Sequence, residues 1–312
     1  MKQLIADKKT VLADISLVFV ALFWGSNFVI IKQALDVIHP FPYLGIRFII
    51  AALLLAPFFW KRLARAPVRD YLDGCLIGLF LFGGFAFQTV GLLYTTPANS
   101  GFITNTAVII VPFLYFLVTR RSPGWWAYVG GLLAASGLYL LSANDVAGLG
   151  IGDALTLVCA FLFAGHLVAI GIFVQRSDAI VLAVTQIAFT GVASMTAALI
   201  FEPTALMLHQ PPAIWGAILY AVVFCTIGAF VAQTYAQRFT PPTHASLILS
   251  LEAAFAGLFS YLFWDEIFTM QKLIGAALIL AGILTTELRP VLAAKVSARR
   301  AALARRGAPP IE

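Results

Sequence analysis

Uncharged polar side chains stand inside several long apolar segments, and these are the residues best suited to bind a solute. Asn27 and His166 lie near the middle of two such segments, and Gln88 and Gln233 lie late in two others. Polar groups in an apolar layer are costly, so each needs a partner or a function. Their amides and imidazole offer donors and acceptors suited to a zwitterion; hydrogen bonding between helices is the alternative.

Two aromatic residues stand next to this polar set. Trp24 and Phe163 lie about one helical turn before Asn27 and His166, on the same helical faces. Aromatic walls with a few polar groups are typical of a cavity for an amphipathic or aromatic solute. Plain helix packing is the alternative for Trp24. Asn105, Ser100, Thr104, Ser250 and His244 are secondary candidates for the same cavity.

Two charged residues also lie within apolar segments. Glu252 lies roughly 13 Å deep and Arg47 roughly 9 Å deep from the opposite side, at about 1.5 Å per residue. Glu252 is a candidate proton carrier or a structural cap for neighbouring backbone groups. Arg47 is predicted to be structural and to bind backbone carbonyls or Asp36.

The composition requires that these residues be positioned by membrane helices. The chain has 312 residues, of which 61% are hydrophobic and 11% charged, against roughly 25% charged in soluble domains. A span needs about 20 mostly apolar residues. The sequence predicts an all-α integral membrane protein with ten transmembrane helices, at about 12–33, 41–60, 72–93, 98–119, 125–143, 152–174, 180–201, 213–237, 243–264 and 270–289.

The distribution of basic residues predicts the orientation. With residues 1–11 in the cytoplasm, 17 of the 20 lysines and arginines fall on the cytoplasmic side, including those of a basic tail at 290–312. This bias favours both termini inside. Five of the six tryptophans fall at span ends, as expected for an interfacial aromatic belt.

The chain contains two copies of one unit, 12–143 and 152–289. Gln88 matches Gln233 at an offset of 145, and Asn27 matches His166 at an offset of 139. Further pairs are Gly130 with Gly275, Gly137 with Gly282, Thr95 with Thr240, Pro97 with Pro242, Asp14 with Asp153, Trp24 with Phe163 and Arg47 with Gln186. Chance resemblance between apolar helices is the alternative, and these polar matches argue against it.

The second copy is expected to be inverted, because five spans, an odd number, separate equivalent positions. Arg120 and Arg121 then face the cytoplasm, while the equivalent Asp265 and Glu266 face outward, so each loop carries the charge that suits its side. Two inverted five-helix repeats permit alternating access, in which a central site opens first to one side and then to the other.

The equivalent residues Pro112 and Gly257 are candidate gating kinks, since proline bends a helix; static kinks that improve helix packing are the alternative. Small residues in "GCLIG" (74–78) and "AYVGGLLAA" (127–135) favour close helix contact, within the fold or in a homodimer.

The sequence carries no sign of a cofactor. The three cysteines lie in apolar segments without motif spacing, so free thiols are expected. We find no nucleotide-binding loop, no histidine pair at metal-ligand spacing and no nucleophile motif. An enzyme is therefore disfavoured, as is a scaffold, and no metal or nucleic-acid partner is expected. The expected partners are the lipid bilayer and a small solute.

Three segments resemble the drug/metabolite transporter superfamily, specifically its EamA-like ten-helix members. They are "WGSNFVIIKQAL" (24–35), "RFIIAALLLAP" (47–57) and "LEAAFAGLFSYLFWDEIFTMQKLIGAALILAGIL" (251–284). The family's proline after "LE" is replaced here by Ala253. Within the family, the chain looks most like YddG-type exporters of aromatic and other amino acids. The resemblance implies a secondary transporter that exports amino acids or similar small metabolites across the bacterial inner membrane; another metabolite or a drug-like solute is the alternative.

Overall fold

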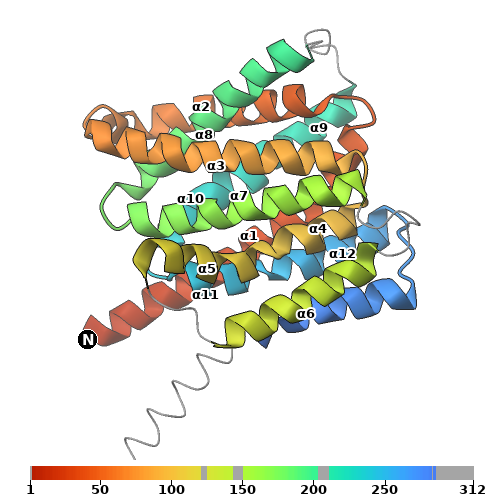
Figure 1. Cartoon of the computed structure of the whole chain (residues 1–312). Helices are drawn as coiled ribbons and strands as arrows, with labels where there is room; N and C mark the ends of the chain where they lie inside the picture. The colour runs from red at the N-terminus through yellow and green to blue at the C-terminus, as the bar shows by residue number, and fades with distance from the viewer. Residues whose placement is uncertain (1, 121–124, 143–149, 203–210, 283, 286–312) are drawn as a thin grey trace, which may run out of the picture.

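The fold is a bundle of helices. The computed structural model describes residues 2–120, 125–142, 150–202, 211–282, 284 and 285, and all regular structure in them is helical (Figure 1). The helices are α1 (Lys2–Ala34), α2 (Pro40–Leu63), α3 (Val68–Leu92), α4 (Pro97–Asn105), α5 (Ala107–Thr119), α6 (Trp125–Ser142), α7 (Ile151–Phe173), α8 (Ala179–Phe201), α9 (Pro212–Tyr220), the π-helix η2 (Ala221–Gly228), α10 (Ala229–Ala236), α11 (Pro242–Leu249), α12 (Leu251–Phe263) and a last helix, Met270–Gly282.

Eight of the described helical segments are long and apolar enough to cross a membrane. They match eight of the predicted spans, with α4 and α5 forming one span, α9 to α10 another and α11 with α12 a third. Two shorter apolar helices, Tyr128–Gly137 within α6 and Met270–Gly282, lie at the remaining two predicted positions. The basic tail after residue 289 lies outside the described residues.

Local sequence explains where many of these helices begin. Four of them start at a proline, whose fixed φ suits the first helical turn and whose missing N–H is not needed there: Pro40, Pro97, Pro212 and Pro242. Side chains also cap α4 and α8: Thr96 accepts from the Asn99 N–H, and Asp178 accepts from the N–H groups of Ile180 and Val181.

The helices are interrupted at positions that sequence reasoning did not identify. Breaks lie at Thr106, between α4 and α5, and at Ser250, between α11 and α12, whereas Pro112 and Gly257 lie inside α5 and α12. The breaks thus lie six residues before Pro112 and seven before Gly257. At Thr106 the helix tightens, because the Thr106 N–H and its hydroxyl both donate to the Ile103 carbonyl. The gating role itself stays a prediction.

The two copies end the equivalent helices in the same way. Among the described residues, two non-glycine residues have positive φ, Arg120 (59°) and Asp265 (51°). Arg120 follows α5 and Asp265 follows α12 by two residues, and their numbers differ by 145. A left-handed residue is a common helix terminator, although it is unusual for side chains other than glycine and asparagine.

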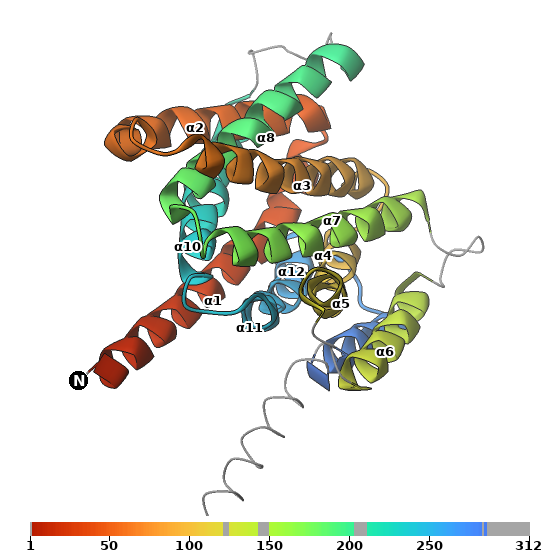
Figure 2. The same ribbon diagram turned by 60° about the vertical axis from the view of Figure 1, so that its left-hand side comes forward.

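Helix contacts between the two copies build the bundle. α2 lies along α8, α3 lies against α7 and α8, and α1 lies against α12 (Figures 1 and 2). The "GCLIG" stretch is used inside the chain: a Cβ added at Gly74 or Gly78 would lie within 3 Å of the Thr185 or Phe189 side chain. Those small residues therefore let α3 approach α8 closely.

A reciprocal glycine contact joins α6 to the last helix. A Cβ added at Gly137 would lie 2.5 Å from the Gly275 carbonyl oxygen, and one added at Gly282 would lie 2.5 Å from the Gly130 carbonyl oxygen. The repeat offset of 145 converts the first contact into the second. The two helices run side by side at one edge of the bundle in both ribbon views (Figures 1 and 2).

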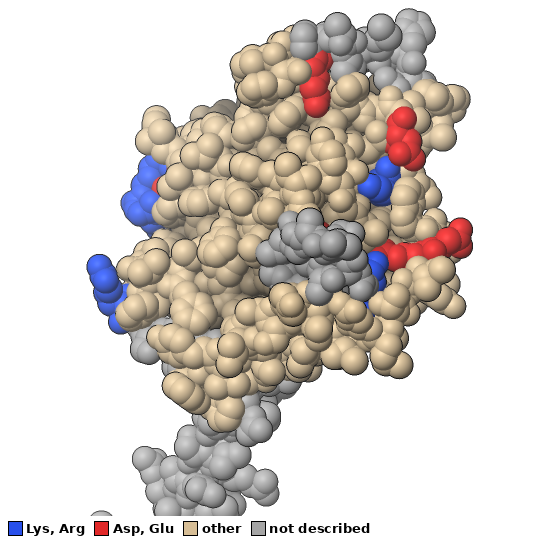
Figure 3. All heavy atoms as spheres, turned by 45° about the vertical axis from the view of Figure 1, so that its right-hand side comes forward, with Lys and Arg blue, Asp and Glu red and all other residues tan. Residues whose placement is uncertain are grey.

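The outer surface separates apolar from charged residues. Large apolar side chains are exposed along the helices, among them Leu53, Phe58, Leu132 and Val192. In the space-filling view, lysines and arginines gather at one end of the bundle, and acidic residues with a few basic ones lie at the other (Figure 3). A wide band between the two ends shows almost no charge on this face, as expected for a multi-pass membrane protein.

Candidate functional site

One cavity brings together the polar and aromatic residues selected from the sequence. Trp24, Asn27, Gln88, Phe163, His166 and Gln233 all line it, and so does Glu252. The other lining residues are Phe28, Ile31, Leu81, Phe85, Thr104, Asn105, Ala107, Val108, Leu167, Phe230 and Leu249. Arg47, Pro112 and Gly257 do not line it, and of the secondary candidates Ser100, Ser250 and His244 do not.

The cavity wall is built from equivalent positions of the two copies. Fourteen of the eighteen described lining residues form seven pairs at the offsets found in the sequence. At 139 these are Trp24 with Phe163, Asn27 with His166 and Phe28 with Leu167; at 145 they are Phe85 with Phe230, Gln88 with Gln233, Thr104 with Leu249 and Ala107 with Glu252. The same faces of both copies therefore meet around one space.

Aromatic rings form much of this wall. The ring centroid of Phe230 lies 5.2 Å from that of Trp24 and 6.1 Å from that of Phe85, and the Phe85 and Phe163 centroids are 5.2 Å apart. These distances are typical of attractive edge-to-face and tilted pairs. Sequence reasoning missed Phe85 and Phe230, although the same offset of 145 relates them. The Trp24 indole is held in place because its Nε1–H donates to the Cys225 carbonyl at 2.9 Å.

Hydrogen bonds hold several polar lining residues. The His166 Nε2 atom lies 2.7 Å from the Gln186 Oε1 atom; an amide oxygen only accepts, so Nε2 donates and Nδ1 is left as an acceptor. Gln186 in turn donates to the Thr234 hydroxyl at 3.0 Å. Gln88 donates to the Thr104 hydroxyl at 3.2 Å. The orientation of the imidazole is thus fixed by residues behind the wall.

Two lining amides keep an unsatisfied oxygen. Asn27 and Gln233 are 4% and 1% exposed, and neither Asn27 Oδ1 nor Gln233 Oε1 has a hydrogen-bond partner among the described residues. A buried acceptor without a donor costs roughly 1–3 kcal/mol. Such groups in a cavity wall are suited to a guest that supplies the missing donor.

Glu252 occupies a special place on α12. The break at Ser250 puts it in the first turn of the helix. Its side chain is half-buried, and it is the one carboxylic acid among the described lining residues. No described residue donates a hydrogen bond to it.

Arg47 lies behind the cavity wall rather than in it. Its side chain is fully buried; Nε donates to the Thr226 hydroxyl at 2.7 Å and Nη2 to the Cys225 carbonyl at 3.1 Å. The guanidinium carbon lies about 5 Å from the ring centroids of Phe48 (5.0 Å) and Phe85 (5.1 Å). Of the two partners predicted for Arg47, a backbone carbonyl is present, that of Cys225. Asp36, the other, is exposed, whereas the Arg47 side chain is buried.

Equivalent hydrogen bonds lie at the two ends of the bundle. The Thr95 hydroxyl donates to Asp153 Oδ1 at 2.6 Å, and the Thr240 hydroxyl donates to Asp14 Oδ1 at 3.1 Å. The offsets of 145 and 139 convert one bond into the other. Each bond joins the loop before a broken helix to a helix of the other copy, in the first turn of α7 for Asp153 and within α1 for Asp14. His244 Nε2 lies 3.3 Å from Asp14 Oδ2.

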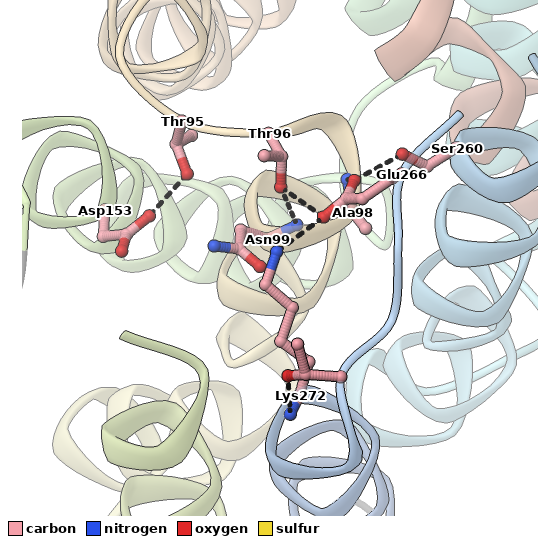
Figure 4. A network of polar contacts seen from close by, with 9 residues as sticks. Thr95, Thr96, Ala98, Asn99, Asp153, Ser260, Glu266 and Lys272 are labelled. Carbon is pink, nitrogen blue, oxygen red and sulfur yellow. Dashed lines mark hydrogen bonds and ion pairs between the residues drawn. The ribbon is translucent and has the colours of Figure 1, made fainter. Parts of the chain in front are cut away.

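The side chain of Glu266, in the loop predicted to lie on the outer side of the membrane, is 4% exposed and makes several hydrogen bonds (Figure 4). It accepts from the hydroxyls of Thr96 and Ser260, from the Ala98 N–H at 3.4 Å and from the Lys272 ammonium at 3.1 Å. The carboxylate therefore ties the loop after α12 to the first turn of α4. Arg121, its equivalent, lies outside the described residues.

No three histidine, cysteine or acidic side chains within the described ranges come close enough together to hold a metal ion. The groups that the cavity offers to a solute are a carboxylate, amides, an imidazole and aromatic faces. That combination is suited to holding a small solute.

Comparison with known proteins agrees with this arrangement. The sequence model of the EamA-like transporter family matches residues 11–143 and again residues 150–287. An uncharacterised transporter of Archaeoglobus fulgidus is 37% identical over 283 residues, which cover 90% of this chain and 87% of that protein. The uncharacterised transporter YetK of Bacillus subtilis is 25% identical over 295 residues, covering 90% and 88%.

A solved crystal structure shares the fold, with a TM-score of 0.66 and 19% sequence identity over 90% of this chain and 97% of that one. The family model covers both copies, and the Archaeoglobus relative extends over nearly the whole length. The chain therefore belongs to the EamA-like transporter family.

Proposed function

We propose that this transporter exports amino acids, aromatic ones included, and similar small metabolites by alternating access through the cavity described above. The observation that carries the proposal is the composition of the wall, in which fourteen of eighteen residues are seven equivalent pairs. A site shared by two equivalent halves can be exposed to either side when the halves exchange conformations. The aromatic faces and amides suit a solute with an apolar side chain and a polar head.

The architecture proposed for this function is ten helices in two inverted five-helix repeats. Three further observations support it: the reciprocal glycine contact of α6 with the last helix, the left-handed residues Arg120 and Asp265, and the two Thr–Asp hydrogen bonds. Each is reproduced by the offsets found in the sequence. A feature and its equivalent at opposite ends are expected of copies with opposite orientation.

The proposed orientation has both termini in the cytoplasm and the chain in the bacterial inner membrane. The clustering of basic residues at one end of the bundle supports it (Figure 3). Arg120 then lies at the cytoplasmic end and Asp265 at the outer end.

The cavity is narrow in this conformation. Its volume is about 60 Å³, and one buried water needs roughly 10–15 Å³ on this measure. A few waters fit, whereas an amino acid enters only after the helices separate. Because the Thr–Asp hydrogen bonds are formed at both ends and the cavity is small, we assign this conformation to the occluded intermediate of the transport cycle.

Flux measurement tests the proposal. Purified protein is reconstituted into liposomes loaded with labelled phenylalanine or leucine, and efflux is compared with that from protein-free liposomes. Asn27→Ala and His166→Ala should each reduce efflux about 2- to 12-fold, the loss expected for one neutral hydrogen bond. Thr196→Ala is the matched control, because the Thr196 hydroxyl is exposed and bonds only within its own helix, to the Val192 carbonyl. Efflux no faster than from protein-free liposomes would contradict the proposal.

Labelling of single cysteines tests the orientation. In a variant lacking Cys75, Cys159 and Cys225, Arg120→Cys and Asp265→Cys are treated in intact cells with a membrane-impermeant maleimide. The residue at 265 should react and the residue at 120 should not. Equal reaction of the two positions would exclude the inverted arrangement.

A further inference from the structure

Five of the seven pairs in the cavity wall match in polarity, and two do not: Thr104 with Leu249 and Ala107 with Glu252. Ala107 and Glu252 occupy equivalent positions, yet one is a methyl group and the other a carboxylate. No described lysine or arginine lines the cavity, so the Glu252 carboxyl group has no basic side chain beside it in the wall. A charge in an apolar site needs a partner, and a guest is the partner still missing here.

The position of the Glu252 carboxylate is central. It lines the same cavity as Asn27 of α1, Gln88 of α3 and His166 of α7, so three other helices surround the space that it faces. The carboxylate is therefore available to a guest inside the cavity.

The neighbouring aromatic rings favour the same kind of guest. Trp24, Phe85, Phe163 and Phe230 contact one another in a chain around the cavity, with centroid separations of 5.2 to 6.1 Å. Faces of aromatic rings attract cations and disfavour anions. A carboxylate beside several rings is a suitable environment for a protonated amine.

Recognition of an anion has no equivalent support. Arg47 is the nearest buried cation described, but it lies behind Phe85 and does not line the cavity. Two of its nitrogen atoms are bonded to Thr226 and Cys225. An anionic guest would meet Glu252 without a compensating positive charge.

We infer that Glu252 is the specificity-determining residue of the cavity and that it binds the ammonium group of a solute carrying a protonated amine. This inference rests on the proposed function in one respect, that the cavity is the transport site. The amides of Asn27 and Gln233 and the imidazole of His166 then contact the remaining polar groups of the solute. Solutes that carry a carboxylate but no amine are rejected.

Three probes of similar size test the inference on the unaltered protein. Phenethylamine is a cation, phenylalanine a zwitterion and 3-phenylpropionate an anion, and all three carry the same ring. Binding to the purified protein is measured by calorimetry, and flux is measured in liposomes. Phenethylamine and phenylalanine should bind and 3-phenylpropionate should not. If the anion binds as tightly as the amines, or if neither amine binds, the inference is overturned.

Variants locate the effect at one residue. Glu252→Gln should weaken binding of phenethylamine about 10- to 100-fold, the range for loss of a charge-assisted hydrogen bond, while Glu252→Asp should keep the preference for amines. Glu202→Gln is the matched control, because Glu202 follows α8 outside the cavity and accepts from the Phe41 N–H. Undiminished amine preference in Glu252→Gln overturns the inference. If Glu252→Gln does not fold, the probe series on the unaltered protein decides.

The two proposals fail in different ways. Amine binding that depends on Glu252, without flux of any probe, supports the inference and contradicts the transport function proposed for the cavity. Flux of all three probes at similar rates contradicts the inference and leaves the proposed export function standing.

Discussion

At the scale of single residues, Arg47 shows how a charge is held inside an apolar bundle without an acidic partner. Its guanidinium combines a threonine hydroxyl, a backbone carbonyl and two aromatic rings. The carbonyl, that of Cys225, belongs to the π-helix η2 and also accepts from Trp24. Arg47 therefore supports η2 and, through the shared carbonyl, one aromatic wall of the cavity.

Replacement of Arg47 should destabilise the fold. We expect Arg47→Ala to lower the unfolding free energy by about 3 kcal/mol or more, since it leaves a void and unpaired polar groups. Arg47→Lys should cost less, because it keeps the charge and most of the volume. Thermal unfolding in detergent measures both. An Arg47→Ala variant as stable as the parent but unable to bind phenylalanine would show instead that Arg47 contacts the solute.

Glu202 should make stability depend on pH. Burial of its carboxylate raises its pKa above the usual value of 4.5, although the Phe41 N–H and the charge of His39 act in the opposite direction. A raised folded-state pKa means that the folded protein holds this proton more tightly than the unfolded chain. The stabilisation is thus fully present below about pH 4.5 and is lost as pH rises through the raised pKa.

Glu202→Gln should remove this dependence. Melting temperatures of the parent and the variant are compared between about pH 4 and about pH 8. As pH rises, the melting temperature of the variant should increase relative to that of the parent. A constant difference over that interval would mean that Glu202 titrates alike in the folded and unfolded states.

At the scale of elements, the broken helices and the loops before them are the parts best placed to move. Each Thr–Asp hydrogen bond fastens such a loop to a helix of the other copy, one bond at each end. If the cavity opens toward one end while the other end stays closed, the Thr–Asp bond at the open end should be broken and the bond at the closed end kept.

Removing one hydroxyl should bias the opening. Thr95→Val should increase access from the end that carries Asp153, and Thr240→Val should increase access from the end that carries Asp14. The expected change in population is about 2- to 12-fold, for one hydrogen bond of roughly 0.5–1.5 kcal/mol. Access is measured by the rate at which an impermeant maleimide, applied from either side, labels Ala107→Cys in the variant lacking the native cysteines. Both variants favouring the same side would argue against opposite gates.

Gly257→Ala separates a static glycine from a hinge. A Cβ added there would lie 3.5 Å from the nearest side-chain atom, an ordinary contact, so the fold should tolerate it with a change in melting temperature near zero. Unchanged stability with slower flux would assign the flexibility of α12 to the transport cycle. Unchanged flux would leave Gly257 without a gating role.

At the scale of the whole molecule, the sequence predicted the features that depend on hydropathy and on the internal repeat: the spans and the polar residues of the cavity. The spans follow from hydropathy, because lipid demands long apolar helices. The cavity residues follow from the cost of polar groups in such helices, and the repeat offsets identify their partners. Asn27 with His166 and Gln88 with Gln233 were found in this way before any geometry was known.

The remainder depends on contacts between distant segments. Glu266 accepts a hydrogen bond from Thr96, which is 170 residues away in the sequence. Contacts of this kind bury a carboxylate that the sequence alone would place in an exposed loop. The break at Thr106 and the π-helix at 221–228 depend on local competition between side-chain and backbone hydrogen bonds, which hydropathy does not report. Arg47 could be placed in a span from the sequence, but its partners on η2 could not.

The reciprocal contact between α6 and the last helix has a mechanical consequence. At the offset of 145, Gly137 is equivalent to Gly282 and Gly275 to Gly130, so the Gly137–Gly275 and Gly282–Gly130 contacts are equivalent. If the two copies exchange conformations, this helix crossing therefore keeps the same geometry. A crossing of this kind can stay closed while both gates change state. The two helices can therefore serve as a fixed contact about which the rest of each copy moves. A larger side chain at Gly137 or Gly282 would push α6 and the last helix apart.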